Sequence, residues 1–299
     1  MITEKVKTID GFPLAIAKVK PYFELIKFRL SFLVAFSCAF GYMLGVQGSI
    51  NWLNLAMLSL GGLLVSGSSI TINQIIEKDY DGVMKRTMDR PLPTHRLQVN
   101  EAIIFAFIIG SLGLILLLQF SNVLTTLLAI VSMILYSFVY TPLKRVGPIA
   151  VFVGAFPGAL PPLLGWVAAT GTINYEALLI FGIQFIWQFP HFWAIAWVAD
   201  EDYKRAGFKL LPSGGKKDLA TAIQIMIYTL FLIPLGLLPA IFGITGIKSA
   251  VVVTICGVLF LSQTFYLMKD CSRKSALKIM FGSFIYLPLV QIAYLLDKV

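Results

Sequence analysis

The chain has 299 residues, of which 58% are hydrophobic and only 13% are charged. A soluble domain carries about 25% charged residues, so this composition excludes an ordinary water-soluble enzyme and indicates a protein that crosses a membrane several times. The net charge of +9 does not indicate a nucleic-acid partner, because the basic residues fall in short segments between apolar runs and form no continuous basic face.

Nine apolar runs approach the length of about 20 residues that a membrane-spanning helix needs. We expect transmembrane helices at residues 23–46, 52–76, 101–119, 122–141, 148–168, 176–199, 219–240, 247–268 and 277–296. The sequence therefore predicts an all-α membrane protein. It would consist of a cytoplasmic N-terminal segment, 1–21, and a single intramembrane domain, 22–299.

The basic residues predict the orientation of this bundle. By position, 22 of the 24 Lys and Arg residues lie on one side of the predicted helices, and only Lys248 and Lys298 lie on the other. Loops rich in Lys and Arg stay in the cytoplasm. We therefore expect a cytoplasmic N-terminus and, after nine spans, a C-terminus outside.

The second predicted helix carries a series of polar residues at its C-terminal end. Asn73, Glu77 and Asp81 are spaced four residues apart, so they lie along one gently turning stripe of helix. Acidic residues at the centre of a membrane helix cost roughly 2.5–3.5 kcal/mol each, which argues for a use. Mg²⁺ in proteins binds one or two carboxylates together with phosphate oxygens. We expect Asn73, Glu77 and Asp81 to be catalytic residues that hold this metal.

Basic residues follow the acidic stripe and could bind the same anion. Lys85, Arg86 and Arg90 supply positive charge suited to phosphate oxygens. Carboxylates for a metal beside cations for phosphate are typical of a diphosphate site. The alternative is that these charges only solvate a loop, but Asn73 and Glu77 are placed toward the apolar segment, where solvation gives no reason for them.

The connection after the fourth predicted helix carries Lys144 and Arg145 on the same side of the membrane. Pro142 is expected to end that helix. Either basic residue could reach the diphosphate. The alternative is that the pair is only the usual topology signal of a cytoplasmic loop.

The sixth predicted helix contains Gln188-Phe189-Pro190-His191-Phe192-Trp193 and ends near Asp202 and Tyr203. A proline kink is tolerated in a membrane helix where the helix lines a cavity. A single histidine among aromatic residues is often only a packed residue, and the sequence leaves a substrate-facing role for His191 equally open. The acids near Asp202 form a second polar corner, and the similar endings of the second and sixth helices suggest a weak internal repeat.

Together these helix ends predict a charged site beside apolar helices, which suits a prenyl diphosphate. The series Asn73-x3-Glu77-x3-Asp81, with Met84 to Leu92 after it, resembles the first signature of the UbiA superfamily of intramembrane prenyltransferases. Within this superfamily, later stretches are similar to the heme O synthases, or protoheme IX farnesyltransferases. These stretches are 140–145, 154–166, 190–196 and 202–212.

The resemblance implies a UbiA-type bundle in the bacterial cytoplasmic (inner) membrane, with its active site on the cytoplasmic side. It implies transfer of the farnesyl group of farnesyl diphosphate to a vinyl group of heme b, with water addition. The product would be heme O for heme-copper terminal oxidases. Heme b would be a substrate, Mg²⁺ the cofactor, and heme A synthase or the terminal oxidase a partner.

The resemblance also implies roles for the residues of the sixth helix. Phe189, Phe192 and Trp193 would shelter the allylic cation, and His191 would approach the heme or orient the quenching water. The expected heme and prenyl pocket comprises Gln188, Phe189, Phe192, Trp193 and Tyr203. Asp202 would join Asn73, Glu77 and Asp81 as a metal ligand.

Two features depart from the superfamily pattern. Glu77 stands where Asp is commoner, and Ala206 occupies the position four residues after Asp202, so the second Asp-x3-Asp signature is missing. Whether the protein binds one Mg²⁺ or two therefore stays open. Two other functions compete: a UbiA-type transferase for an aromatic quinone precursor, against which the helix 6 motif argues, and a secondary transporter, whose polar groups would lie near the midplane.

Overall fold

The computed structural model describes residues 19–299 and is all-helical, as the sequence predicts. Nine of the described helices are long and apolar enough to cross a membrane. They are α2 (Phe28–Gly45), α3 (Trp52–Ile76), α5 (Val99–Phe120), the span Val123–Leu143, α8 (Ile149–Thr170), α9 (Tyr175–Val198), α12 (Leu219–Ile241), α13 (Ile247–Asp270) and α14 (Arg273–Leu296). The predicted segment 1–21 lies mostly outside the described residues.

The span Val123–Leu143 is not uniform. It consists of α6 (Val123–Ile134), a π-helical segment η1 (Leu135–Tyr140) and the short α7 (Thr141–Leu143). Pro142 lies in this last turn, and the helix ends one residue later, close to the expected boundary. The π-turns carry one residue more per hydrogen-bonded ring than an α-helix, so they change the face on which later residues lie.

The first membrane helix begins at Phe28, later than the sequence predicts, because the backbone at Lys27 leaves the helical conformation and interrupts the helix. Lys27 has a left-handed backbone with φ 43°, which is unfavourable for a residue with a side chain. Two carbonyls freed by the break are paired. Gln74 Nε2 donates to the Leu25 carbonyl at 2.6 Å, and Ser31 Oγ donates to the Ile26 carbonyl at 2.7 Å. The break is therefore a built feature of the fold.

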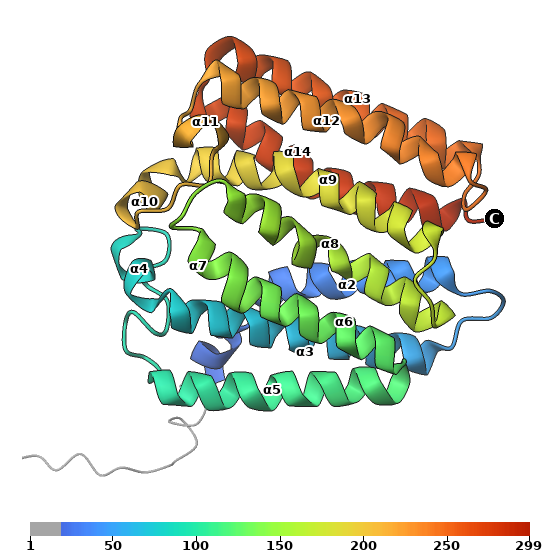
Figure 1. Cartoon of the computed structure of the whole chain (residues 1–299), viewed down its shortest axis with the longest axis horizontal. Coiled ribbons are helices and arrows are strands. Elements are labelled where there is room, and N and C mark those ends of the chain that lie inside the picture. The colour runs from blue at the N-terminus through green and yellow to red at the C-terminus, as the bar shows by residue number, and fades with distance from the viewer. Residues whose placement is uncertain (1–18) are drawn as a thin grey trace, which may run out of the picture.

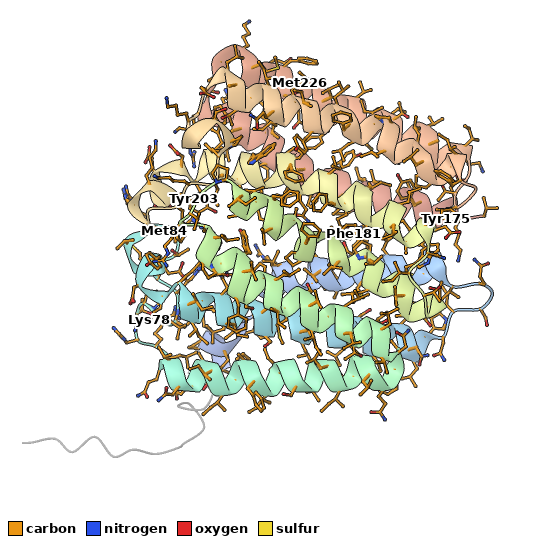
Figure 2. All side chains as sticks on the ribbon, in the orientation of Figure 1. Lys78, Met84, Tyr175, Phe181, Tyr203 and Met226 are labelled. Atoms are coloured by element: carbon orange, nitrogen blue, oxygen red, sulfur yellow. The ribbon has the colours of Figure 1, made fainter. Side chains whose placement is uncertain are left out.

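The short helices gather at one end of the bundle. Figure 1 shows α4 (Lys78–Val83), α10 (Asp200–Arg205) and α11 (Pro212–Gly215) at the same end, while the C-terminus lies at the other. Met84 and Tyr203, which follow α3 and α9 in the chain, lie near each other there in Figure 2 and share a small apolar cluster with Phe208. The bundle therefore has one structured polar end.

Two helices of this bundle approach each other at backbone distance. A Cβ atom on Gly165 of α8 would lie 1.8 Å from the Cys38 carbonyl oxygen of α2, and one on Gly41 would lie 1.9 Å from the Pro162 carbonyl oxygen. Such glycine contacts let membrane helices pack closely without side chains between them. They fix α2 against α8 on one side of the cavity described below.

Helices α3 and α9 end in the same way. Glu77 has φ −94° and ψ 8°, Ala199 has φ −95° and ψ 11°, and each residue is followed by a six-residue helix. This shared local geometry agrees with the weak repeat expected from the sequence. At both positions the chain changes direction, so that α4 and α10 lie at the polar end of the bundle.

Candidate functional site

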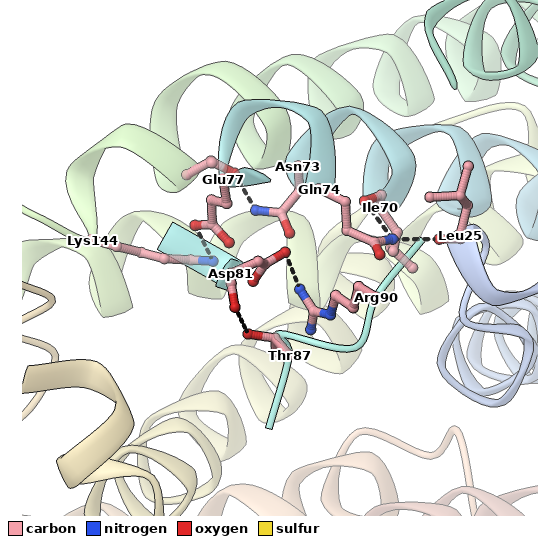
Figure 3. Close-up of polar contacts among 10 residues, drawn as sticks. Leu25, Ile70, Asn73, Gln74, Glu77, Asp81, Thr87, Arg90 and Lys144 are labelled. Carbon is pink, nitrogen blue, oxygen red and sulfur yellow. Dashed lines mark hydrogen bonds and ion pairs between the residues drawn. The ribbon is translucent and has the colours of Figure 1, made fainter. Parts of the chain in front are cut away.

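The predicted acidic stripe is buried at the polar end of the bundle. Asn73, Glu77 and Asp81 are 2%, 4% and 0% exposed, and their side chains gather in Figure 3. Lys144 Nζ lies 2.7 Å from Glu77 Oε1, and Arg90 Nη1 lies 2.6 Å from Asp81 Oδ2. Buried carboxylates require such partners because transfer of a bare charge out of water is costly. The structure thus brings together the three side chains that the sequence spacing places on one stripe.

The loop after α4 is folded so that Arg90 returns to Asp81. Thr87 Oγ1 donates to the Asp81 carbonyl at 2.9 Å, and the Arg90 amide donates to the Thr87 carbonyl at 3.0 Å. Thr94 Oγ1 then donates to the Arg90 carbonyl at 2.7 Å. These local bonds hold the guanidinium at the acid and explain why a basic residue nine positions away reaches it.

Asn73 is oriented by the π-helical segment. Its Nδ2 donates to Thr141 Oγ1 at 2.9 Å, and that hydroxyl donates to the Tyr136 carbonyl, also at 2.9 Å. Because the amide nitrogen is used in this way, Asn73 Oδ1 is left as the acceptor beside the acids. Asp81 Oδ1 is buried and has no hydrogen-bond partner among residues 19–299. Both oxygens are therefore free for a ligand.

The other predicted phosphate-binding residues lie at the rim. Arg86 lies over the Tyr203 ring, 4.9 Å from its centroid, and Arg145 lies over Tyr80 and donates to its hydroxyl. The Lys85 side chain is exposed, and its backbone amide donates to Asp202 Oδ1 at 3.0 Å. Of the pair Lys144 and Arg145, only Lys144 contacts the buried acids.

The second acidic corner does not join the first. Asp202 accepts from the Lys85 amide and from Arg205, while Asp200 pairs with Lys204 at 2.9 Å and with Lys217 at 3.0 Å. Within the described part of the chain, no three Asp, Glu, His or Cys side chains converge as a metal site. The structure thus does not bring Asp202 together with Glu77 and Asp81, and its role as a metal ligand stays a prediction. In this structure Asp202 instead ties the α10 segment to the loop after α4.

Lys27 belongs to the charged site although its sequence position gives little sign of it. The backbone break before α2 leaves it half-buried within electrostatic reach of Asp81, Arg90 and Lys144. The pKa of Lys27 is lowered to about 7, chiefly by burial and in addition by the neighbouring cations Arg90 and Lys144, while Asp81 opposes them. In a sequence, a lysine before a membrane helix ordinarily indicates only the topology of that helix. The interruption of the helix at Lys27, and the hydrogen bonds that stabilise it, are apparent only in the structure.

A cavity of about 400 Å³ lies below the charged site, within the bundle. It is lined by apolar side chains and a few polar ones from α2, α3, α5, α6, η1, α8, α9 and α14. Tyr140 connects the two regions, because its ring lines the cavity and lies 4.8 Å from Lys144 Nζ. A charged mouth over an apolar cavity can hold an anion with a hydrocarbon tail.

The predicted pocket residues of α9 divide between two faces. Gln188, His191 and Phe192 line the cavity. Phe189 and Trp193 are buried instead against Tyr228 of α12, with ring centroids 4.6 and 5.0 Å from it. These two rings are not among the residues that line the cavity, so the structure does not bring them together with the other predicted pocket residues. Trp187, Tyr136 and Tyr140 supply aromatic wall, and Tyr203 lies at the rim under Arg86.

The chain is similar to known prenyltransferases along nearly its whole length. The UbiA prenyltransferase family matches residues 34–287. A protoheme IX farnesyltransferase of Cytophaga hutchinsonii is 52% identical over 95% of this chain and 99% of its own length. One from Flavobacterium psychrophilum is 46% identical over 92% and 93%.

Solved structures with this fold are more distant in sequence. A digeranylgeranylglyceryl phosphate synthase superposes with a TM-score of 0.77 at 23% identity, covering 94% of this chain and 98% of its own. A UbiA homologue of Archaeoglobus fulgidus, bound to DMAPP and Mg²⁺, has a TM-score of 0.66 at 16% identity, covering 91% and 98%. These likenesses show a shared helical fold.

Proposed function

Because the chain belongs to the UbiA prenyltransferase family, we propose that it transfers the farnesyl group of farnesyl diphosphate to a vinyl group of protoheme IX (heme b). Water addition completes the reaction and gives heme O. The observation that carries the proposal is the cluster of buried acids and bases at the mouth of an apolar cavity. The names of the similar bacterial proteins support this acceptor over a quinone precursor.

The free oxygens at the charged site fit a magnesium ion. Asn73, Glu77 and Asp81 would hold one Mg²⁺, because they supply the amide and carboxylate oxygens that this ion prefers, and the buried Asp81 Oδ1 lacks a partner. Bound Mg²⁺ would neutralise charge on the departing diphosphate. The A. fulgidus homologue with Mg²⁺ and DMAPP supports a metal in this fold.

The cations of the site would change partners when substrate binds. Lys144 and Arg90 now pair with Glu77 and Asp81, and a diphosphate provides them with stronger phosphate contacts. Arg86, Lys85 and Arg145 at the rim would add positive charge around the entering anion. These groups would stabilise the negative charge that grows on the leaving group.

The cavity would hold the apolar parts of both substrates. Its wall at Phe192, Tyr136 and Tyr140 would exclude water from the allylic cation until the vinyl group attacks. Gln188 and His191 would provide the polar contacts in this wall. Because α2 and α14 both line the cavity, we propose that residues 22–299 act as one catalytic domain.

The cellular setting follows from the loop charges. We propose that the polar end faces the cytoplasm in a bacterial inner membrane, and that the C-terminus lies outside. Heme O would then pass to a heme-modifying enzyme, such as heme A synthase, or to a heme-copper oxidase.

The test is product analysis with purified protein in lipid, heme b, farnesyl diphosphate and Mg²⁺. We expect heme O by mass, and Asp81→Asn should lower turnover about 10²–10³-fold, the size of the loss when one preorganised electrostatic contact is removed. Asp79→Asn is the matched control, because Asp79 lies on the same short helix but is exposed. Unaltered heme b together with prenylation of 4-hydroxybenzoate would contradict the proposed acceptor.

A further inference from the structure

His191 has a hydrogen bond that fixes the position of its proton. Its Nδ1 lies 2.9 Å from Ser283 Oγ on α14, and Ser283 Oγ donates its only hydrogen to the Met280 carbonyl at 2.7 Å. The serine oxygen can therefore only accept from His191. The proton of the neutral imidazole thus lies on Nδ1, and Nε2 carries a lone pair.

The ring is also fixed by its neighbours. Trp187 stacks on His191 with ring centroids 4.4 Å apart and planes at 20°, and Phe284 packs edge-on at 5.1 Å. Trp187 Nε1 donates to the Ser283 carbonyl at 3.2 Å. Ser283 therefore anchors both rings of the stack. Metal-binding histidines are typically held in this way, with the second ring nitrogen donating to a fixed acceptor.

The free nitrogen has no partner within the protein. In the part of the chain that the structure describes, His191 is hydrogen-bonded through Nδ1 alone, and the residue lines the cavity. A polar acceptor in an apolar cavity costs free energy until a ligand satisfies it. Of the two substrates proposed above, only heme b carries a metal that can accept this lone pair.

We propose that His191 Nε2 is the axial ligand of the heme iron while heme b is bound as substrate. This inference rests on the proposed function. A neutral imidazole is the form that binds iron, and with the proton on Nδ1 no proton has to leave when the bond forms. Ser283 is the positioning residue, because it sets both the tautomer and the ring plane.

The location of His191 suits the reaction. Phe192 beside it packs on Tyr140 with ring centroids 6.0 Å apart, and Tyr140 carries Lys144 over its ring. Two aromatic side chains thus separate the proposed iron ligand from the cations of the diphosphate site. Anchoring the porphyrin at its centre would hold its vinyl edge at one orientation toward the prenyl group, which lowers the entropic cost of the reaction.

The test is porphyrin binding without farnesyl diphosphate, so that no turnover occurs. Ferric heme b and metal-free protoporphyrin IX are titrated into the purified protein, and absorption spectra report the iron ligand. We expect the wild type to prefer heme b over protoporphyrin IX by about tenfold or more, because only heme b gains the coordination bond. His191→Ala should abolish this preference and the histidine-ligated spectrum, and added imidazole should restore the spectrum in His191→Gly.

Two further variants separate ligation from packing. Ser283→Ala should weaken heme b binding about 10- to 100-fold, the usual effect of losing the partner of a metal-binding histidine, and should leave protoporphyrin IX binding unchanged. His95→Asn is the control, because His95 is the other of the two histidines and lies exposed in a loop with φ 55°. Its spectra should match the wild type.

The outcomes distinguish the two proposals. If wild-type protein farnesylates heme b while His191→Ala keeps the wild-type spectrum and preference, the axial assignment is wrong and the proposed function stands. If the wild type binds neither porphyrin and leaves heme b unaltered, the proposed function fails, and the axial assignment fails with it.

Discussion

Lys27 shows how a single residue can join a site through the backbone. The left-handed break before α2 costs conformational energy, and Gln74 and Ser31 compensate by pairing the freed carbonyls. The result is an amine held in a cationic site with a pKa of about 7. We expect this amine to be a further contact for the diphosphate.

The first prediction concerns the pH dependence of this contact. As the pH rises through about 7, Lys27 in the free enzyme loses its proton, and the site loses one positive charge. The kcat/KM for farnesyl diphosphate should therefore fall above pH 7, by up to about tenfold per pH unit for one essential proton. In Lys27→Arg the charge persists at all these pH values, so this fall should disappear.

The measurement is a pH profile of kcat/KM at saturating heme b. Lys20→Arg is the control, because Lys20 is exposed before the break, and its profile should match the wild type. Superimposable profiles for the wild type and Lys27→Arg would contradict the assignment.

Several site residues are readable from the sequence, and others are not. Asn73, Glu77 and Asp81 are predictable because their spacing and their cost in lipid both indicate a use. The faces of α9 are not predictable, because this helix carries aromatic residues around its whole circumference, and only its neighbours decide which ring meets the cavity. The contacts of Phe189 and Trp193 with Tyr228, and the position of Lys27 at the charged site, therefore emerge only from the structure.

At the level of elements, the π-helical segment η1 sets the direction of the residues that follow it. It places Tyr140 on the cavity, Thr141 on Asn73 and Lys144 on Glu77. No sequence pattern distinguishes η1 from the α-helix that precedes it. The hydropathy of the span Val123–Leu143 predicts a helix, but not its change of pitch.

A one-residue deletion tests this role. Phe138 lies in η1 and is 58% exposed, so its side chain contributes little to the core. Deleting Phe138 would remove the extra residue and let the segment return to α-helical pitch, so the residues after it would keep nearly their present direction relative to α6. Lys144 and Tyr140 would then stay at the site, and most of the activity should be retained in the heme O assay.

The matched variant inserts one alanine after Phe138, which lengthens the segment and would turn the following residues by about 100°. Its activity should fall to background. Equal activity in the deletion and the insertion would show that the direction of these residues does not matter.

For the whole molecule, the predictable part is the number and order of the membrane helices. Hydropathy correctly gives nine spans within the described residues, because lipid requires long apolar helices whatever the function. The predicted starts of the first and last membrane helices differ from the structure by several residues. The first helix starts later because it is interrupted at Lys27, and the last starts earlier because Ser272 caps α14 by accepting from the Ser275 amide. Which residues converge depends on packing between distant helices and is not contained in any single span.

The orientation of the bundle gives a test at this scale. The substitutions are made in a cysteine-free variant of this protein that is expressed in bacterial cells. Lys248→Cys at the start of α13 should react with a membrane-impermeant maleimide in intact spheroplasts. Lys78→Cys at the polar end, labelled in Figure 2, should react only after lysis. The same probe thus reports both faces. Reversed reactivity would place the active site outside.

The internal pairing of Glu77 with Lys144 and of Asp81 with Arg90 has a consequence for biogenesis. A newly made chain entering the bilayer carries its own counter-ions, so the acids need neither metal nor isoprenoid to become buried. We therefore expect the bundle to assemble without its substrates. Cells short of heme or prenyl precursors should then still hold the folded protein in the membrane, which immunoblotting of their membranes would check.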